Sequence, residues 1–153
     1  MNDHVIIRQA NVADAAYIQA LIEELALYEK AADEVEIAVS ELKENGWGKD
    51  PAFESIVAVL KDEVIGTAIF YPRYSTWKGR YMYLEDLVVS EKHRGEGIGS
   101  LLFNEVVRIS EERKAAKMEW QVLEWNTPAI DFYKKMKACF DSEWINVQLT
   151  LKK

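Results

Sequence analysis

The sequence predicts an α+β fold in one domain, and three observations lead to this prediction. The chain has 153 residues, which is close to the usual size of a domain with a single hydrophobic core. Strand-like and helix-like segments follow one another in the order βααβββαβαβ, which is neither all-helical nor a regular alternation. No repeat, low-complexity stretch or linker rich in Pro, Gly or Ser divides the chain. We therefore expect one domain over residues 1–153.

Composition and charge narrow the class of function. The hydrophobic content of 49% with 29% charged residues is that of a soluble globular protein. The net charge of -7, without a basic cluster, does not favour a nucleic-acid partner. Two histidines and the single cysteine, Cys139, give no metal-ligand spacing and no internal disulfide. Because we find neither a signal peptide nor an apolar stretch of about 20 residues, we expect a cytoplasmic protein without membrane or metal.

Patterns in the first half of the chain predict a strand followed by two helices. Residues 4–8 favour a strand, and Asn11 with Asp14 three positions later is typical of a helix N-terminus. The helix that follows ends near residues 28–31, and its inward residues recur at helical spacing, namely Ala15, Ile18, Ile22 and Leu25. A short second helix over 39–44 should stop at Asn45-Gly46.

The second half begins with three strands and continues with helices between further strands. We expect strands over 55–60 and 64–71 with a tight turn at 61–63, and a longer strand over 79–89. A helix should run to about residue 113, with its inward side made of Ile98, Leu101, Leu102, Val106 and Ile109. A strand over 118–123, a helix over 128–136 and a final strand over 144–151 complete the pattern.

The segment between the long strand and its helix has the composition of an anion site. It reads Arg94-Gly95-Glu96-Gly97-Ile98-Gly99-Ser100. Glycines allow backbone N–H groups to approach a ligand closely, and the first turn of a helix has four N–H donors without internal partners. A phosphate fits such a position. Lys92 and His93 make the approach basic within an acidic protein.

Several interpretations compete for this glycine-rich turn. It lacks the acidic ribose-binding residue of a dinucleotide fold and the Gly-Lys-Ser/Thr of a Walker A loop. A glycine-rich helix start that binds nothing is also compatible with the residues. Taken alone, the motif leaves phosphate binding and this purely structural role equally open.

The segments around this turn carry a resemblance to a known family. Asp86-Leu87-Val88-Val89 precedes Arg94-x-x-Gly97-x-Gly99, and Asn126-Thr127-Pro128-Ala129-Ile130-Asp131-Phe132-Tyr133 follows. Together they resemble the GNAT superfamily of N-acetyltransferases, and most closely its spermidine/spermine and thialysine acetyltransferase branch. Further matching stretches are 24–29, 45–48, 83–86 and 124–126.

The resemblance implies a fold and a co-substrate. The fold is a GNAT-like mixed, mostly antiparallel central sheet flanked by helices and splayed at the acetyl-CoA site. Backbone groups matching Leu87, Val88 and Val89 pair with the pantetheine. The residues implied to hold the pyrophosphate are Arg94, Gly95, Glu96, Gly97, Ile98, Gly99 and Ser100, and those near the thiol end are Asn126, Pro128, Ala129 and Tyr133.

Acetyl transfer to an amine needs a base and an acid, and the resemblance supplies a candidate for each. Glu85 matches a glutamate beside the substrate and is the candidate base, although a charge on a strand surface is the simpler interpretation of that residue alone. By strand alternation, Asp86 should face the opposite side from Glu85. Tyr133 matches the family's general acid, whereas a tyrosine in Phe132-Tyr133 taken alone is more often a packing residue. Direct attack is favoured because Cys139 has no recognisable His partner.

The resemblance is weaker for the amine acceptor. Residues that match or neighbour acceptor contacts are Tyr28, Glu29, Glu85, Glu119, Trp120, Gln121 and Glu143. Ser75 stands where relatives have an aspartate, and Lys137 where they have a glycine. The acceptor is therefore expected to be a diamine, polyamine or thialysine-like amine. Alternatives are another acceptor, such as an aminoglycoside or a protein amine, or a non-catalytic acyl-CoA-binding regulator. The branch also implies a homodimer.

Overall fold

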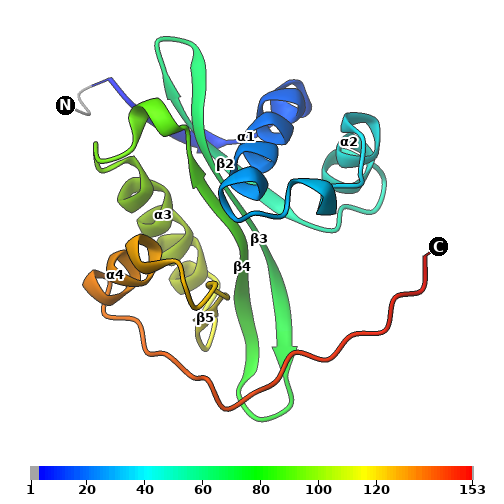
Figure 1. The fold of residues 1–153 in the computed structure, drawn as a ribbon, viewed down its shortest axis with the longest axis vertical. Coiled ribbons are helices and arrows are strands. Elements are labelled where there is room, and N and C mark those ends of the chain that lie inside the picture. Colours follow the sequence, from blue (N-terminus) through cyan, green and yellow to red (C-terminus); the bar gives the residue numbers. More distant parts are fainter. Residues whose placement is uncertain (1–3, 153) are drawn as a thin grey trace. The chain divides into compact units, whose positions relative to one another are not determined.

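The computed structural model describes residues 4–152, which form two compact units that divide between Gln121 and Val122. The first unit contains a five-stranded sheet in the order β1-β2-β3-β4-β5 (Figure 1). Its strands are β1 (Ile6–Gln9), β2 (Glu54–Leu60), β3 (Glu63–Ser75), β4 (Gly79–Val89) and β5 (Met118–Glu119). Strands β1 to β4 pair antiparallel, and β5 pairs parallel to β4. The predicted mixed, mostly antiparallel sheet is confirmed.

Helices cover both faces of this sheet. They are α1 (Ala15–Tyr28), α2 (Val39–Trp47) and α3 (Ile98–Glu112), with single 3-10 turns η1 (Val12–Asp14), η2 (Ala32–Glu34) and η3 (Glu91–His93). Both α1 and α3 contact β3 and β4, and they lie on either side of the sheet in Figure 1. Every residue over 55–58 and 65–70 is buried, which is expected only where a sheet is covered on both faces. One core cluster contains Ala10, Ala15, Ile18, Leu42, Val57 and Ile69.

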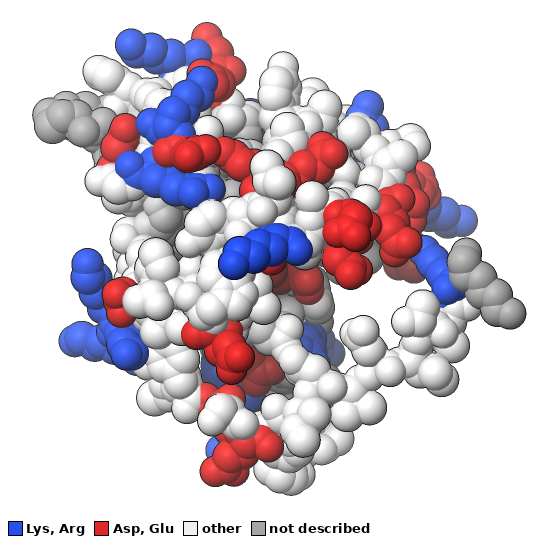
Figure 2. All heavy atoms as spheres, in the orientation of Figure 1, with Lys and Arg blue, Asp and Glu red and all other residues white. Residues whose placement is uncertain are grey.

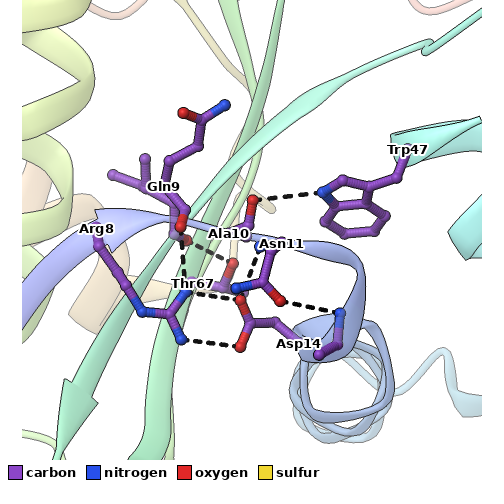
Figure 3. Close-up of polar contacts among 9 residues, drawn as sticks. Arg8, Gln9, Ala10, Asn11, Asp14, Trp47 and Thr67 are labelled. Carbon is purple, nitrogen blue, oxygen red and sulfur yellow. Dashed lines mark hydrogen bonds and ion pairs between the residues drawn. The ribbon is translucent and has the colours of Figure 1, made fainter.

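The start of α1 is fixed by a network of polar contacts, which we call the N-terminal joint (Arg8, Asn11 and Asp14; Figure 3). The backbone N–H of Asn11 donates to the Asp14 carboxylate at 2.8 Å, which with the Asn11 side chain completes a capping box. The guanidinium of Arg8 donates two hydrogen bonds to the same carboxylate, at 2.8 and 3.0 Å. The predicted cap is confirmed, and Arg8 is a partner that the capping pattern does not contain.

Helix α2 continues beyond the predicted stop at Asn45-Gly46, so that prediction is wrong. The helix reaches Trp47, whose ring packs edge-on against Phe53 with centroids 5.9 Å apart. The indole N–H of Trp47 also donates to the carbonyl of Ala10 at 3.3 Å. A Cβ on Gly46 would lie 2.6 Å from the Phe53 ring, so the glycine here makes room for packing and does not end the helix.

The hairpins of the sheet follow the predicted order with one longer strand. Positive φ angles of 50° at Lys61 and 65° at Asp62 form the tight turn between β2 and β3. β3 continues to Ser75 because it pairs with β4 as far as Gly79. β4 has the predicted bounds.

Helix α3 packs closely on the sheet, but its buried side differs from the prediction. Ile98, Leu102 and Val106 are buried as expected, whereas Leu101 is 37% exposed, Ile109 is half-buried and Phe103 is buried. Successive helical residues point about 100° apart, so the buried stripe includes position 103 and leaves 101 at its edge. A Cβ on Gly66 would lie 3.0 Å from the Leu102 side chain, which shows how closely the helix approaches β3.

The second unit contains α4 (Thr127–Lys135), close to the predicted helix. The strand predicted over 118–123 is only Met118–Glu119. The prediction of a final strand over 144–151 is wrong, because within residues 4–152 this segment pairs with no strand. Its apolar side chains are exposed, with Trp144 at 75% and Val147 at 90%. Alternating apolar residues indicate a strand only when a neighbouring strand provides hydrogen bonds.

Candidate active site

The glycine-rich segment forms an open helix N-terminus between β4 and α3. Gly95 and Gly97 have φ angles of 80° and 81°, a left-handed conformation that favours glycine. Gly97 is the N-cap of α3, and no side chain caps this end. The first N–H groups of the helix are therefore available to an anion. This is the backbone geometry that the sequence predicted for phosphate binding.

The side chains of the same segment have different environments. Ile98 is buried and attaches the helix to the core, while Glu96 lies 3.4 Å from Nδ1 of His93. The Nε of Arg94 donates to the carbonyl of Val89 at 3.2 Å. In Figure 2, basic side chains gather at the upper left, over the segment before α3 and the nearby β2–β3 turn. There Lys92 pairs with Glu63 at 3.3 Å. The basic side chains beside the turn are thus interspersed with carboxylates such as Glu63 and Glu96.

Strand β4 has one edge without a strand partner over its last residues. β5 pairs with β4 only at Met82 and Tyr83, so the two strands separate beyond this point. Ser90 N–H donates to Ile65 on β3, and backbone groups alternate along a strand, so those of Val89 point to the open edge. Leu87 and Val89 are half-buried and Val88 is buried. The pantetheine position implied for Leu87, Val88 and Val89 stays a prediction.

A β-bulge lies on β4 at the candidate base. Ile69 pairs with Asp86 and Phe70 pairs with Leu84, so Glu85 is an extra residue without a partner. Bulges redirect side chains and frequently lie beside active sites. The strict alternation that we expected for Glu85 and Asp86 therefore does not apply here.

Three carboxyl groups interact electrostatically near this bulge, and we call Glu29, Glu85 and Asp86 the carboxylate cluster. Burial, with the charges of Glu85 and Glu29 adding to it, raises the pKa of Asp86 to about 7. Burial also raises the pKa of Glu29. Glu85 itself is exposed. A cluster with excess negative charge attracts a cation, and binding one would relieve the unfavourable charge on Asp86.

Tyrosines from neighbouring strands surround the cluster. The hydroxyl of Tyr71 donates to Oε1 of Glu85 at 2.7 Å, and burial together with this bond raises the pKa of Tyr71. The rings of Tyr71 and Tyr83 lie 5.5 Å apart. The guanidinium of Arg73 lies 4.5 Å from the centre of the Tyr83 ring. The hydroxyl holds Glu85 in one orientation.

The candidate acceptor residues Glu119, at the end of β5, and Trp120 and Gln121, which follow it, are less available. Glu119 pairs with Lys117 at 2.9 Å and with Arg73 at 3.7 Å. Trp120 packs edge-on against Phe103 at 5.3 Å between ring centres. Gln121 is exposed. Of these three, Glu119 is already compensated by cations, and Trp120 has a packing role.

The remaining candidates belong to the second unit. Asn126 is 6% exposed and caps α4, with its side-chain oxygen accepting from the N–H of Ala129 at 3.4 Å. Pro128 lies in the first turn of that helix. Tyr133 is half-buried, with its ring 5.4 Å from that of Phe132. Glu143 is exposed, and its N–H donates to Asp141 at 2.9 Å. The roles of these residues in the reaction stay predictions.

Within the first unit the structure brings together Tyr28, Glu29, Glu85 and Arg94. The guanidinium of Arg94 lies 5.3 Å from the centre of the Tyr28 ring. Sequence reasoning missed Asp86 as a titrating group and missed Glu24, whose carboxylate accepts from the N–H of Glu91 at 3.0 Å. Asp86 follows Glu85 directly, but its burial and the bulge depend on strand pairing. The contact of Glu24 spans 67 residues of sequence, and no local pattern indicates it.

Within residues 4–152, no three His, Cys, Asp or Glu side chains are grouped so that they could hold a metal ion. No helix in the same range has the length and apolar character needed to cross a membrane.

Comparisons with known proteins point to one family. The acetyltransferase (GNAT) family matches residues 18–137. The chain is 38% identical over 142 residues to thialysine N-epsilon-acetyltransferase of Bos taurus, covering 88% of this chain and 84% of that protein. It is 31% identical over 143 residues to the human spermidine/spermine N(1)-acetyltransferase-like protein 1, covering 89% of this chain and 21% of that protein.

Solved structures show the same fold. An aminoglycoside acetyltransferase from an uncultured soil metagenomic sample matches with a TM-score of 0.80 at 19% identity, covering 99% of this chain and 100% of that chain. An integron cassette protein from V. cholerae matches with a TM-score of 0.79 at 24% identity, covering 96% and 93% of the two chains. At these identities, the likeness establishes the arrangement of strands and helices and nothing about the acceptor.

Proposed function

Because this chain belongs to the acetyltransferase (GNAT) family and is an N-acetyltransferase, we propose that it transfers acetyl from acetyl-CoA to a primary amine of a small cationic acceptor. One observation carries the choice of acceptor. The carboxylate cluster of Glu29, Glu85 and Asp86 lies in the same unit as the glycine-rich turn, and burial together with the charges of Glu85 and Glu29 raises the pKa of Asp86. The contact of Arg94 with Tyr28, the residue before Glu29, supports an anion site and a cation site near one another.

The residues of the glycine-rich turn fit acetyl-CoA as co-substrate. When bound, acetyl-CoA supplies the acetyl group as a thioester. The uncapped N-terminus of α3 supports a pyrophosphate contact through Gly97, Gly99 and Ser100. Arg94 adds a positive charge, and the open edge of β4 from Leu87 to Val89 offers backbone groups for pairing with the pantetheine.

The acceptor must lose a proton before it attacks the thioester. An alkylammonium resembling lysine has a pKa of about 10.4, so only about one in a few thousand is neutral at pH 7. Glu85, held by Tyr71 at 2.7 Å, takes this proton directly or through a water. Asp86 and Glu29 attract the cation and hold its remaining charge.

The leaving sulfur needs a proton, which we assign to the hydroxyl of Tyr133. A tyrosine of pKa about 10 is able to protonate a thiolate whose conjugate thiol has a pKa of about 8.5. Replacing Tyr133 by Phe should lower turnover on the order of 10²-fold with little change in the affinity for acetyl-CoA. Single-turnover rates and equilibrium binding separate the two effects, and equal turnover would remove Tyr133 from the mechanism.

The acceptor class that we propose is a diamine, polyamine or thialysine-like amine. Thialysine N-epsilon-acetyltransferases are among the relatives at 38% identity, which supports a lysine-sized amine. The pairing of Glu119 with Lys117 and Arg73 supports a site with fewer free carboxylates than a long polyamine needs. Ser75, where relatives carry an aspartate, also supports a site with fewer free carboxylates.

We also propose that the chain is one domain, forms a homodimer and is located in the cytoplasm. The family match over 18–137 runs across the division between the two units, which supports one N-acetyltransferase domain. The exposed apolar side chains of 144–151 support a homodimer in which this segment finds a strand partner. A single exposed cysteine, Cys139, fits a cytoplasmic location. Sedimentation showing a monomer at micromolar concentration would discard the dimer.

The decisive experiment follows the release of CoA thiol from acetyl-CoA with a panel of amines. The panel contains a diamine, a polyamine, thialysine, an aminoglycoside and a peptide amine. We expect the small cationic amines to stimulate release most strongly. If no amine stimulates release although acetyl-CoA binds, the proposed transfer is wrong. A preference for the aminoglycoside or the peptide would replace the acceptor class.

A further inference from the structure

Two residues on α1 contact the segment that leads into the glycine-rich turn. Glu24 and Tyr28 are one helical turn apart and therefore share a face of α1. The Oε1 of Glu24 accepts from the backbone N–H of Glu91 at 3.0 Å, and the guanidinium of Arg94 stacks over the ring of Tyr28 at 5.3 Å. Glu24 and Glu91 also line one shallow surface pocket together with Ser90 and Lys92. The helix thus contacts both ends of segment 91–94.

This segment has few backbone hydrogen bonds of its own, and beside the contacts with α1 it has the ion pair of Lys92 with Glu63 and the contact of His93 with Glu96. Its own hydrogen bonds are those of one 3-10 turn, from His93 N–H to the Ser90 carbonyl and from Arg94 N–H to the Glu91 carbonyl. A Cβ placed on Gly95 would meet nothing within 4 Å, so no packing fixes the next residue. The stack on Tyr28 and the bond to the Val89 carbonyl both act on the guanidinium of Arg94. Together they fix the point where the turn begins.

The same end of α1 also contributes to the carboxylate cluster. Glu29 follows Tyr28 directly, and its charge helps to raise the pKa of Asp86. One helix end therefore contacts the segment before the turn through Tyr28 and the cluster through Glu29. A residue in this position influences co-substrate binding without touching the acetyl group.

We propose that Glu24 and Tyr28 are positioning residues that hold segment 91–94, and with it Arg94, in the conformation that binds the pyrophosphate of acetyl-CoA. The inference rests on the proposed function, namely that the turn binds acetyl-CoA. It gives Tyr28 a role different from the acceptor contact that its family match implies. Holding a binding loop in place before the ligand arrives reduces the ordering cost of binding.

The test compares paired substitutions by calorimetric titration with CoA. Tyr28→Leu removes the ring and should weaken CoA binding about 2- to 5-fold, the range of one exposed cation–π contact. Tyr28→Phe keeps the ring and should bind like the wild type. Glu24→Ala should weaken binding on the order of 5-fold, whereas Glu24→Gln, whose amide oxygen still accepts from Glu91 N–H, should recover most of it. Tyr17→Leu, at a tyrosine of the same helix that is 59% exposed, is the matched control.

Steady-state kinetics distinguish positioning from acceptor contact. Positioning predicts that Tyr28→Leu raises KM for acetyl-CoA and leaves KM for the amine unchanged. If Tyr28→Leu and Glu24→Ala bind CoA as the wild type does, or if the two tyrosine variants raise only the amine KM, the inference is overturned while the proposed function stands. If the wild type itself does not bind CoA, both fall. Thermal unfolding of each variant verifies that it is folded.

Discussion

The N-terminal joint and the carboxylate cluster place the same kind of side chain in opposite electrostatic situations. At the joint, Asp14 is buried but accepts hydrogen bonds from Arg8 and from Asn11 N–H, and these partners lower its pKa. In the cluster, Asp86 is surrounded by carboxylates, and its pKa is raised to about 7. Burial raises the pKa of both residues. At Asp86 burial is the largest cause and the charges of Glu85 and Glu29 add to it, whereas at Asp14 the hydrogen bonds from Arg8 outweigh burial and lower the pKa.

The comparison separates the charges that stabilise the fold from those that we assign to function. The joint is compensated internally and connects β1 to α1. In the cluster, the charges that act on Asp86 are those of two further carboxylates, and the proposed cationic amine provides a positive charge. A site that is unfavourable when empty binds its ligand more tightly for that reason.

The largest effect should follow from removing charge at Glu85. Glu85→Gln should lower kcat/KM on the order of 10²-fold, because the amide no longer accepts a proton from the ammonium. The free energy of unfolding should change little, since Glu85 is exposed. Initial rates and urea unfolding of the same preparation measure both. A variant with wild-type activity would show that water and other groups replace Glu85 as base.

Removing charge at the N-terminal joint should lower the stability of the fold and leave the activity nearly unchanged. Arg8→Ala leaves the Asp14 carboxylate without its cation and should lower the free energy of unfolding by about 2–3 kcal/mol at pH 7, with activity retained below the melting range. The folded pKa of Asp14 is lowered, so its contribution is present above the unfolded pKa of about 3.9 and is lost as pH falls through the folded value.

Urea unfolding at pH 7 and pH 3 measures this difference. The gap between wild type and Arg8→Ala should shrink at the lower pH. Arg108→Ala on α3, which removes an exposed arginine paired with Glu105 and Glu112, is the matched control and should cost far less. A joint variant as stable as this control would mean that the pair at Asp14 does not hold the start of α1.

The smallest of these effects should come from replacing Asp86, and this replacement should stabilise the folded protein. The folded pKa of about 7 exceeds the unfolded value of about 3.9, so between these values the unfolded state binds fewer protons and stability falls as pH rises. Asp86→Asn should therefore raise the free energy of unfolding by about 1–2 kcal/mol at pH 8 and by much less at pH 4. Loss of stability at pH 8 would contradict the raised pKa.

The contrast also shows what a single sequence predicts and what it does not. Strand β4 and the turn from Arg94 to Ser100 have strong local signals, since a run of β-favouring residues and three glycines need no distant partner. The capping box at Asn11 and Asp14 is local too. Segment 144–151 has a strand-like pattern, but whether it forms a strand depends on a neighbour that its own residues do not specify.

The candidate site depends on contacts that are distant in sequence. The bulge that isolates Glu85 arises from the register between β3 and β4. The charge felt by Asp86 comes partly from Glu29, at the end of α1. Phe53, not the helix signals of α2, explains Gly46. The residue types of the site were therefore predictable, whereas their mutual effects required the fold.

In the proposed function, the carboxylate cluster of Glu29, Glu85 and Asp86 selects a cationic acceptor. This selection is the centre of the account. It is tested most directly by kcat/KM for two primary amines of equal length, one with a second cationic group and one with a neutral end. We predict at least about a tenfold preference for the dication, which corresponds to about 1.4 kcal/mol and should fall as salt is raised from 0.05 to 0.5 M. Equal kcat/KM values, or a preference for the neutral amine at low salt, would contradict the account.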